Sequence, residues 1–211
     1  MQDLQLSEFK NIPIHHGTLL SLLKEYQNPN DKISRWIKAG TLIPLQRGLY
    51  LVGDLWRNST PCLPLIANHL YGPSCVSLDY ALSWHGIIPE KVVEITSVTT
   101  KRSLSIENAL GRFSYHTIAQ SVYPIGIQSQ PFEHGYFLLA SPEKALCDKL
   151  LTTRNLRMTS QQSMQIFLEE DLRIDMDMLV DFDFTIIDAY IGAGIKTHLF
   201  KVLKGLLQEI A

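Results

Sequence analysis

The alternation of apolar and polar residues after position 17 predicts two short helices before the first β-strands. Residues 18–26 have the spacing of an amphipathic helix, and the Asn-Pro-Asn sequence that follows is typical of a turn. A second helix is expected to begin at Asn30 or Asp31, whose side chains can cap it. Gly40 is expected to end this helix in the left-handed conformation.

The second helix divides into an apolar face and a basic face. Ile33, Trp36 and Ile37 recur at i, i+3 and i+4, which predicts a stripe packed against a core. The outward faces then carry Lys32, Ser34, Arg35 and Lys38.

Two apolar, β-prone runs at residues 42–45 and 48–52 follow the helix and predict a β-hairpin around Gln46-Arg47-Gly48. A basic helix followed by a hairpin is the order of a winged helix-turn-helix, a class that places its helix in the major groove of DNA. In this reading some side chains neutralise phosphates and Ser34 or Arg35 reaches a base edge. The predicted phosphate contacts are Lys32, Arg35, Lys38 and Arg47.

The net charge of the chain indicates that any DNA-binding surface is confined to one part of the protein. The net charge of −2 and the pI near 6.4 are not those of a protein that coats nucleic acid regardless of sequence. Residues 1–60 hold seven Lys and Arg against five Asp and Glu, whereas residues 169–188 hold eight acids and one base. The acidic part is therefore distant in sequence from the predicted DNA-binding helix.

The remaining composition indicates a cytoplasmic protein with neither metal nor cofactor. Three widely spaced cysteines form no C-x-x-C pair, and the seven histidines do not assemble a ligand set. The first residues are polar and acidic, unlike a signal peptide, and no apolar run approaches the ~20 residues of a membrane span. No membrane association is expected.

The whole pattern predicts an α+β protein of two domains. Residues 1–53 form the winged helix-turn-helix, and residues 54–211 form a mixed domain with a small antiparallel sheet and a helical C-terminus. The expected helices of the second domain cover residues 61–71, 77–85, 141–152 and most of the chain after 160, and its expected strands cover residues 92–100, 112–116 and 135–139.

Two short motifs suggest catalysis, and neither is complete. Ser141-Pro142-Glu143-Lys144 fits the S-x-x-K motif of penicillin-binding enzymes, but the accompanying motifs are absent and the four residues suit a helix N-terminus. Asp181 and Asp183 resemble the paired aspartates of nucleotidyltransferases, but no glycine-serine phosphate loop precedes them. The chain is not expected to be an enzyme.

Five blocks in the same order resemble the AbiEi family of antitoxins, and the resemblance covers roughly residues 18–150. They are RGLY at 47–50, YGPSCVSLDYALSWHGIIPE at 71–90, ITSVTTKRS at 95–103, GRFSYH at 111–116 and ASPEKALCDKL at 140–150.

The resemblance implies an antitoxin of a type IV toxin–antitoxin pair, a kind of system that acts in phage defence, and it implies that the antitoxin also represses transcription of its own operon. Its winged helix would bind operator DNA upstream of its own gene. Its second domain would counter a nucleotidyltransferase-like toxin without forming a stable complex with it. Within this resemblance the expected functional surface of the second domain carries Lys101, Arg102 and Arg112.

The alternative is a regulatory or interaction protein whose winged helix is degenerate and does not bind DNA. The family has two helices before its DNA-reading helix, whereas here only residues 18–26 clearly precede it, unless residues 4–11 supply another.

Overall fold

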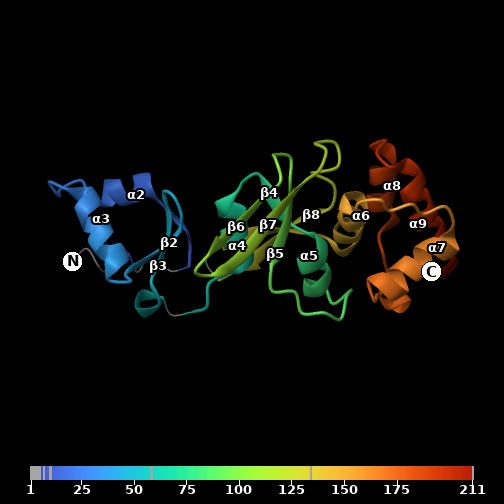
Figure 1. Ribbon diagram of the computed structural model, residues 1–211, viewed down its shortest axis with the longest axis horizontal. Helices are drawn as coiled ribbons and strands as arrows, with labels where there is room; N and C mark the ends of the chain where they lie inside the picture. The colour runs from blue at the N-terminus through green and yellow to red at the C-terminus, as the bar shows by residue number, and fades with distance from the viewer. Residues whose placement is uncertain (1–5, 7, 10, 58, 134, 211) are drawn as a thin grey trace.

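The computed structural model describes residues 6, 8–9, 11–57, 59–133 and 135–210. The molecule is elongated: a small N-terminal unit lies at one end, a β-sheet in the middle and the C-terminal helices at the other end (Figure 1). It is an α+β protein with two separate sheets, one of three strands and one of six. None of the described helices is long and apolar enough to cross a membrane.

The N-terminal unit contains the predicted pair of helices and the predicted hairpin. Helices α2 (His16–Leu22) and α3 (Pro29–Lys38) precede strands β2 (Leu42–Gln46) and β3 (Leu49–Val52). A short strand that was not expected, β1 (Ile14–His15), pairs with β3 and completes a three-stranded antiparallel sheet.

Helix α3 begins earlier than predicted. Asn28 is its N-cap residue and Pro29 is its first residue, so neither Asn30 nor Asp31 caps it. Proline suits this position because its fixed φ is already helical and its missing N–H has no partner to lose. Gly40 ends the helix as expected, with φ of +72°. A further helix was considered for residues 4–11, of which residues 4, 5, 7 and 10 lie outside the described residues.

The expected apolar stripe of α3 is confirmed. Ile33 and Trp36 are buried, and Ile37 packs against the same cluster. They contact a small core drawn from α2 and from the three-stranded sheet. Burial of this stripe fixes which face of the helix turns toward solvent.

The sheet of the second unit is larger than predicted, and it is mixed. Its strand order is β6-β7-β5-β4-β9-β8, and the β4–β9 and β5–β7 pairs are parallel. The prediction of a small antiparallel sheet was therefore wrong. The strands are β4 (Ser74–Val76), β5 (Ile95–Thr99), β6 (Leu104–Asn108), β7 (Gly111–Thr117), β8 (Ile127–Phe132) and β9 (Gly135–Ala140).

The physical reason for this error lies in three strands that the sequence pattern does not reveal. β4 has only three residues, all buried, which is too short to display a period of two. β6 and β8 are the edge strands, and neither has a fully buried face. Both parallel pairs join strands that are not consecutive in the chain: β5 pairs with β7, and β4 pairs with β9.

The helices that pack against this sheet lie close to the positions predicted from the sequence. Helix α4 (Leu63–Leu70) packs near β7, since the Tyr115 hydroxyl donates a 2.7 Å hydrogen bond to the Ala67 carbonyl. Helix α5 (Leu78–Trp84) follows β4 and ends at Gly86, as predicted.

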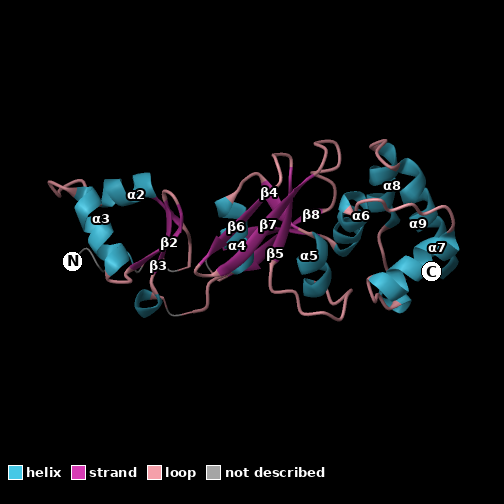
Figure 2. Cartoon of the chain, in the orientation of Figure 1, coloured by secondary structure: helices cyan, strands magenta, loops and turns pink. Residues whose placement is uncertain are grey.

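The C-terminal part is helical, as predicted, and forms the far end of the molecule (Figure 2). A π-helical turn (Phe167–Asp171) and a 3-10 turn (Met176–Leu179) interrupt it. Its α-helices are α6 (Pro142–Thr152), α7 (Gln161–Ile166), α8 (Phe184–Gly192) and α9 (Thr197–Ile210).

The β2–β3 hairpin is shared between two hydrophobic clusters. Leu42 and Val52 belong to the cluster of the N-terminal unit, whereas Leu45, Leu49 and Leu51 belong to the large cluster of the second unit. Because side chains alternate between the two faces of a strand, each face of the hairpin packs against a different core. The hairpin is therefore the packed connection between the two units.

Candidate nucleic-acid interface

Three of the predicted DNA contacts lie on the outward face of α3. Ser34, Arg35 and Lys38 are all exposed. No carboxylate of the described chain forms an ion pair with Arg35 or Lys38. Both charges are therefore available to a phosphate, and the buried side of α3 holds them on a fixed helix face.

Lys32 lies on the same helix in a different environment. Its ammonium nitrogen is 5.1 Å from the ring centroid of Trp36 and 5.9 Å from that of Tyr26, and the side chain is half-buried. A cation over aromatic faces is attracted by their quadrupoles. Lys32 is therefore held against the helix, and of the predicted contacts on α3 it has the least freedom to follow a phosphate.

Arg47 is exposed, but the turn that carries it does not project freely. The Gln46 side-chain amide donates a 2.8 Å hydrogen bond to the Leu70 carbonyl at the end of α4. The Asn108 side-chain amide donates a 3.1 Å bond to the Leu45 carbonyl. The hairpin turn is thus docked on the second unit, an arrangement that no local sequence pattern predicts.

The three cations predicted for the second unit are not equivalent. The Lys101 ammonium donates to the Gly72 carbonyl and lies 5.3 Å from the ring centroid of Tyr71. Arg112 Nε is 3.8 Å from Glu94 Oε1, an exposed ion pair. Arg102 is exposed, and no ion pair forms with it in the part of the chain that the structure describes. Arg102 is therefore the most available of the three.

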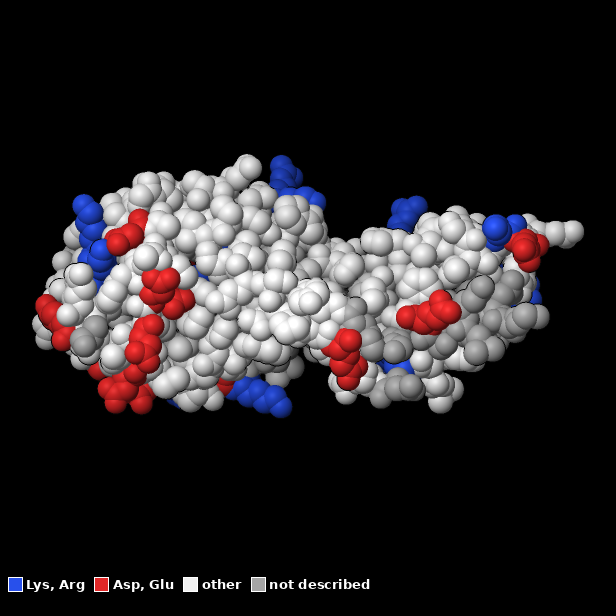
Figure 3. Space-filling view, turned by 180° about the vertical axis from the view of Figure 1, so that it is seen from behind, with Lys and Arg blue, Asp and Glu red and all other residues white. Residues whose placement is uncertain are grey.

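The end of α4 brings the cations of the two units toward each other. Leu70 accepts the bond from the hairpin turn that carries Arg47, and Gly72, two residues further, accepts the bond from Lys101. Figure 3 shows Lys and Arg groups along the upper edge of both lobes, on either side of the narrow waist. Asp and Glu are more numerous on the lower part of the larger lobe in the same view.

The S-x-x-K motif forms a helix N-terminus, as its structural interpretation predicted. The Ser141 hydroxyl accepts a 3.2 Å hydrogen bond from the Lys144 backbone N–H, and Pro142 is the first residue of α6. The Lys144 side chain is fully buried and points into a polar cluster, with its ammonium 3.2 Å from Asp148 Oδ2 and 3.2 Å from the Tyr190 hydroxyl.

Asp148 is the centre of this buried cluster. Its Oδ1 accepts a 2.6 Å hydrogen bond from the Tyr190 hydroxyl, and its Oδ2 accepts a 2.7 Å bond from the Ser77 hydroxyl. Burial and the Asp148 charge both raise the pKa of Tyr190, so this phenol stays protonated. All four side chains are inaccessible to solvent, and every charge has a partner. The cluster therefore joins α5, α6 and α8 and presents no reactive group to a substrate.

Asp181 and Asp183 are exposed on either side of buried Phe182. Asp183 caps α8, where Oδ1 accepts hydrogen bonds from the backbone N–H and the hydroxyl of Thr185, and these bonds lower its pKa. Across the described ranges no group of three or more His, Cys, Asp or Glu is arranged to hold a metal ion.

The three cysteines are buried free thiols. Burial raises the pKa of Cys75 to about 12 and also raises those of Cys62 and Cys147. Because the thiolate is the reactive form, these residues are poor nucleophiles in the folded protein.

No protein-family model and no curated protein matches this chain.

Proposed function

We propose that this protein is a type IV antitoxin that binds operator DNA upstream of its own gene and represses its own operon in the cytoplasm. The observation that carries the DNA-binding proposal is the outward face of α3, where Ser34, Arg35 and Lys38 are exposed and the cations have no carboxylate partner in the described chain. The five blocks that resemble AbiEi antitoxins support the rest.

The environment of each side chain indicates whether it would contact a base edge or a phosphate. Arg35 has the reach and the planar donors to bind a guanine edge in the major groove, with Ser34 beside it. Lys38 and Arg47 are assigned to phosphates, and Lys32 to a phosphate beside the start of α3. Arg102, together with its sequence neighbour Lys101, extends the cationic surface into the second unit. A footprint of this size is compatible with a net charge of −2, because the acids lie mainly elsewhere.

The antitoxin part of the proposal concerns the second unit. It would counter a nucleotidyltransferase-like toxin through its effect on the toxin's target or product, without a stable complex. Arg102 is the residue we assign first to this surface. No enzymatic activity is proposed, because the one buried cluster of charged side chains described above is closed to solvent and internally paired.

Binding of the purified protein to its own upstream DNA, compared with a scrambled duplex at several salt concentrations, tests the DNA-binding proposal. Arg35→Ala is expected to weaken specific binding by about 1–3 kcal/mol, or roughly 5- to 150-fold. Lys38→Ala is expected to weaken binding to both duplexes and to lower the salt slope by about one.

Lys201→Ala provides the matched control for this measurement, because Lys201 is an exposed lysine on α9, far from α3. It should leave both the affinity and the salt slope unchanged. Equal weak binding to both duplexes, unaltered by Arg35→Ala, would contradict operator recognition.

A second candidate is a regulatory or interaction protein that does not bind DNA. The docked hairpin turn favours it, because hydrogen bonds to Leu70 and from Asn108 limit how far Arg47 can move toward a duplex. In that case the upstream duplex would be bound no better than the scrambled duplex, whereas rescue of growth upon co-expression with a neighbouring toxin gene would still be lost in Arg102→Ala.

A further inference from the structure

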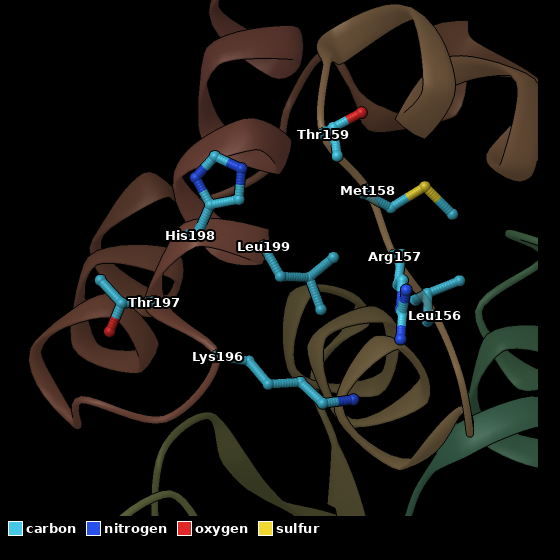
Figure 4. A pocket seen from close by; sticks show the side chains of 8 residues that line it. All are labelled: Leu156, Arg157, Met158, Thr159, Lys196, Thr197, His198 and Leu199. Carbon is cyan, nitrogen blue, oxygen red and sulfur yellow. The ribbon is translucent and has the colours of Figure 1, made fainter.

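An open pocket of about 460 Å³ lies between the segment after α6 and the beginning of α9. Figure 4 shows residues 156–159 on one side and the first turn of α9 on the other, with the Leu199 side chain between them. The pocket is far from α3, and no motif of the sequence analysis falls on it. Its lining consists of Leu156, Arg157, Met158, Thr159, Lys196, Thr197, His198 and Leu199.

The apolar part of the lining is aliphatic. Leu156, Met158 and Leu199 supply it, and the only ring among the lining residues is the imidazole of His198. A nucleobase would find no aromatic face on which to stack. Flexible methionine and leucine side chains instead suit an alkyl chain. The pocket volume lies within the range of small-molecule sites, about 300–1,000 Å³.

The charged part of the lining is entirely positive. Arg157 and Lys196 contribute cations, and no Asp or Glu lines the pocket. Figure 4 shows the Arg157 guanidinium and the Lys196 ammonium directed toward the same end of the pocket. This excess of positive charge contrasts with the eight acids of residues 169–188 in the same helical part.

The two cations have different roles. The Lys196 ammonium donates to the carbonyls of Leu151 at 2.8 Å, Leu150 at 3.3 Å and Thr153 at 3.4 Å, which holds it at the end of α6. Arg157 is exposed, and the described residues offer it no ion pair. Arg157 is therefore the group that can bind an incoming anion directly, while Lys196 supplies a fixed charge nearby. The beginning of α9 is the positive end of its helix dipole, which also favours an anion in the pocket.

We propose that this pocket binds a small aliphatic carboxylate, a medium-chain acid whose carboxylate pairs with Arg157 and whose alkyl chain lies over Leu156, Met158 and Leu199. A guanidinium and a carboxylate form two parallel hydrogen bonds, which orients the ligand. The aliphatic lining then makes the pocket prefer a ligand with an alkyl chain. This inference does not depend on the DNA-binding proposal.

Titration calorimetry with octanoate on the full-length protein tests this site. The expected result is saturable binding of one octanoate per chain, with much weaker binding of 1-octanol because it lacks the charge. Arg157→Gln is expected to weaken octanoate binding by about tenfold or more, in keeping with the loss of a hydrogen bond between charged groups.

Arg154→Gln is the matched control, because Arg154 is also exposed and lies three residues away but outside the lining. It should change octanoate affinity by less than about twofold, as expected for a screened surface charge. Met158→Trp should abolish binding by filling the apolar part of the pocket. In a ¹³C-methyl methionine spectrum, octanoate should shift the Met158 signal and leave the Met178 signal in place.

Three results would overturn the proposal. They are the absence of saturable octanoate binding, equal losses in Arg157→Gln and Arg154→Gln, and an octanoate-induced shift confined to methionines other than Met158. Thermal unfolding of each variant without ligand shows whether a loss of binding reflects a loss of folding.

Discussion

Asp148→Asn is expected to destabilise the protein by about 3–5 kcal/mol, the range for breaking one side of a buried ion pair. The substitution preserves the size of the side chain but removes its charge. The Lys144 ammonium is fully buried and 3.2 Å from Asp148 Oδ2, so the substitution would leave it without a counterion. Urea unfolding followed by circular dichroism measures the change in the free energy of unfolding.

Three further variants show whether the unpaired charge is the cause: Lys144→Met alone, its combination with Asp148→Asn, and Lys204→Met. Lys144→Met combined with Asp148→Asn removes both charges and should cost less than the sum of the two single changes, because neither ion is left alone. Lys204→Met breaks the more exposed pair with Asp188, whose N–O distance is 2.6 Å, and should cost about 0–1 kcal/mol. Additive losses in the double variant would contradict the ion-pair explanation.

Leu51→Ala is expected to destabilise the protein by about 2–5 kcal/mol, the usual cost of truncating a buried leucine to alanine. Leu51 is fully buried and lies on the hairpin face that belongs to the core of the second unit. Because the hairpin also belongs to the N-terminal unit, the loss should weaken the packing between the units. Hydrogen exchange measured by mass spectrometry should therefore become faster in peptides from α4 as well as in the hairpin.

Val52→Ala is the comparison variant for this prediction. Val52 is also fully buried, but it belongs to the N-terminal cluster with Trp36. Its truncation should accelerate exchange mainly in α3. If both substitutions instead change exchange in the same peptides to the same extent, the two faces of the hairpin do not pack against separate cores.

The predicted contacts of α3 could be located from the sequence because they depend on local periodicity. Ile33 and Trp36 recur with the period of a helix, so the direction of Arg35 and Lys38 follows from the burial of their neighbours. The contacts of Lys101 could not be predicted from local periodicity. Its partners Tyr71 and Gly72 lie some 30 residues earlier and become neighbours only when β4 and β5 pair.

The buried cluster and the pocket illustrate the same limit. Ser77 and Tyr190 reach Asp148 across 71 and 42 residues, respectively, and no spacing in the sequence connects them. The pocket joins residues 156–159 to the start of α9, about 40 residues later. Neither Arg157 nor Lys196 belongs to a recognisable motif, so the sequence offered no signal for this site.

The sequence by itself determined the local elements: the two N-terminal helices, the hairpin, the capped helix α6 and the helical C-terminus. These depend on periodicity, on turn residues and on helix caps, which act over a few neighbouring positions. Only the tertiary structure decided the mixed order of the six-stranded sheet, the docking of the hairpin turn and the burial of Lys144. Each of these depends on which segments, distant in the sequence, bury their apolar surfaces against one another. Local sequence patterns do not determine these pairings, because they result from the packing of the whole chain.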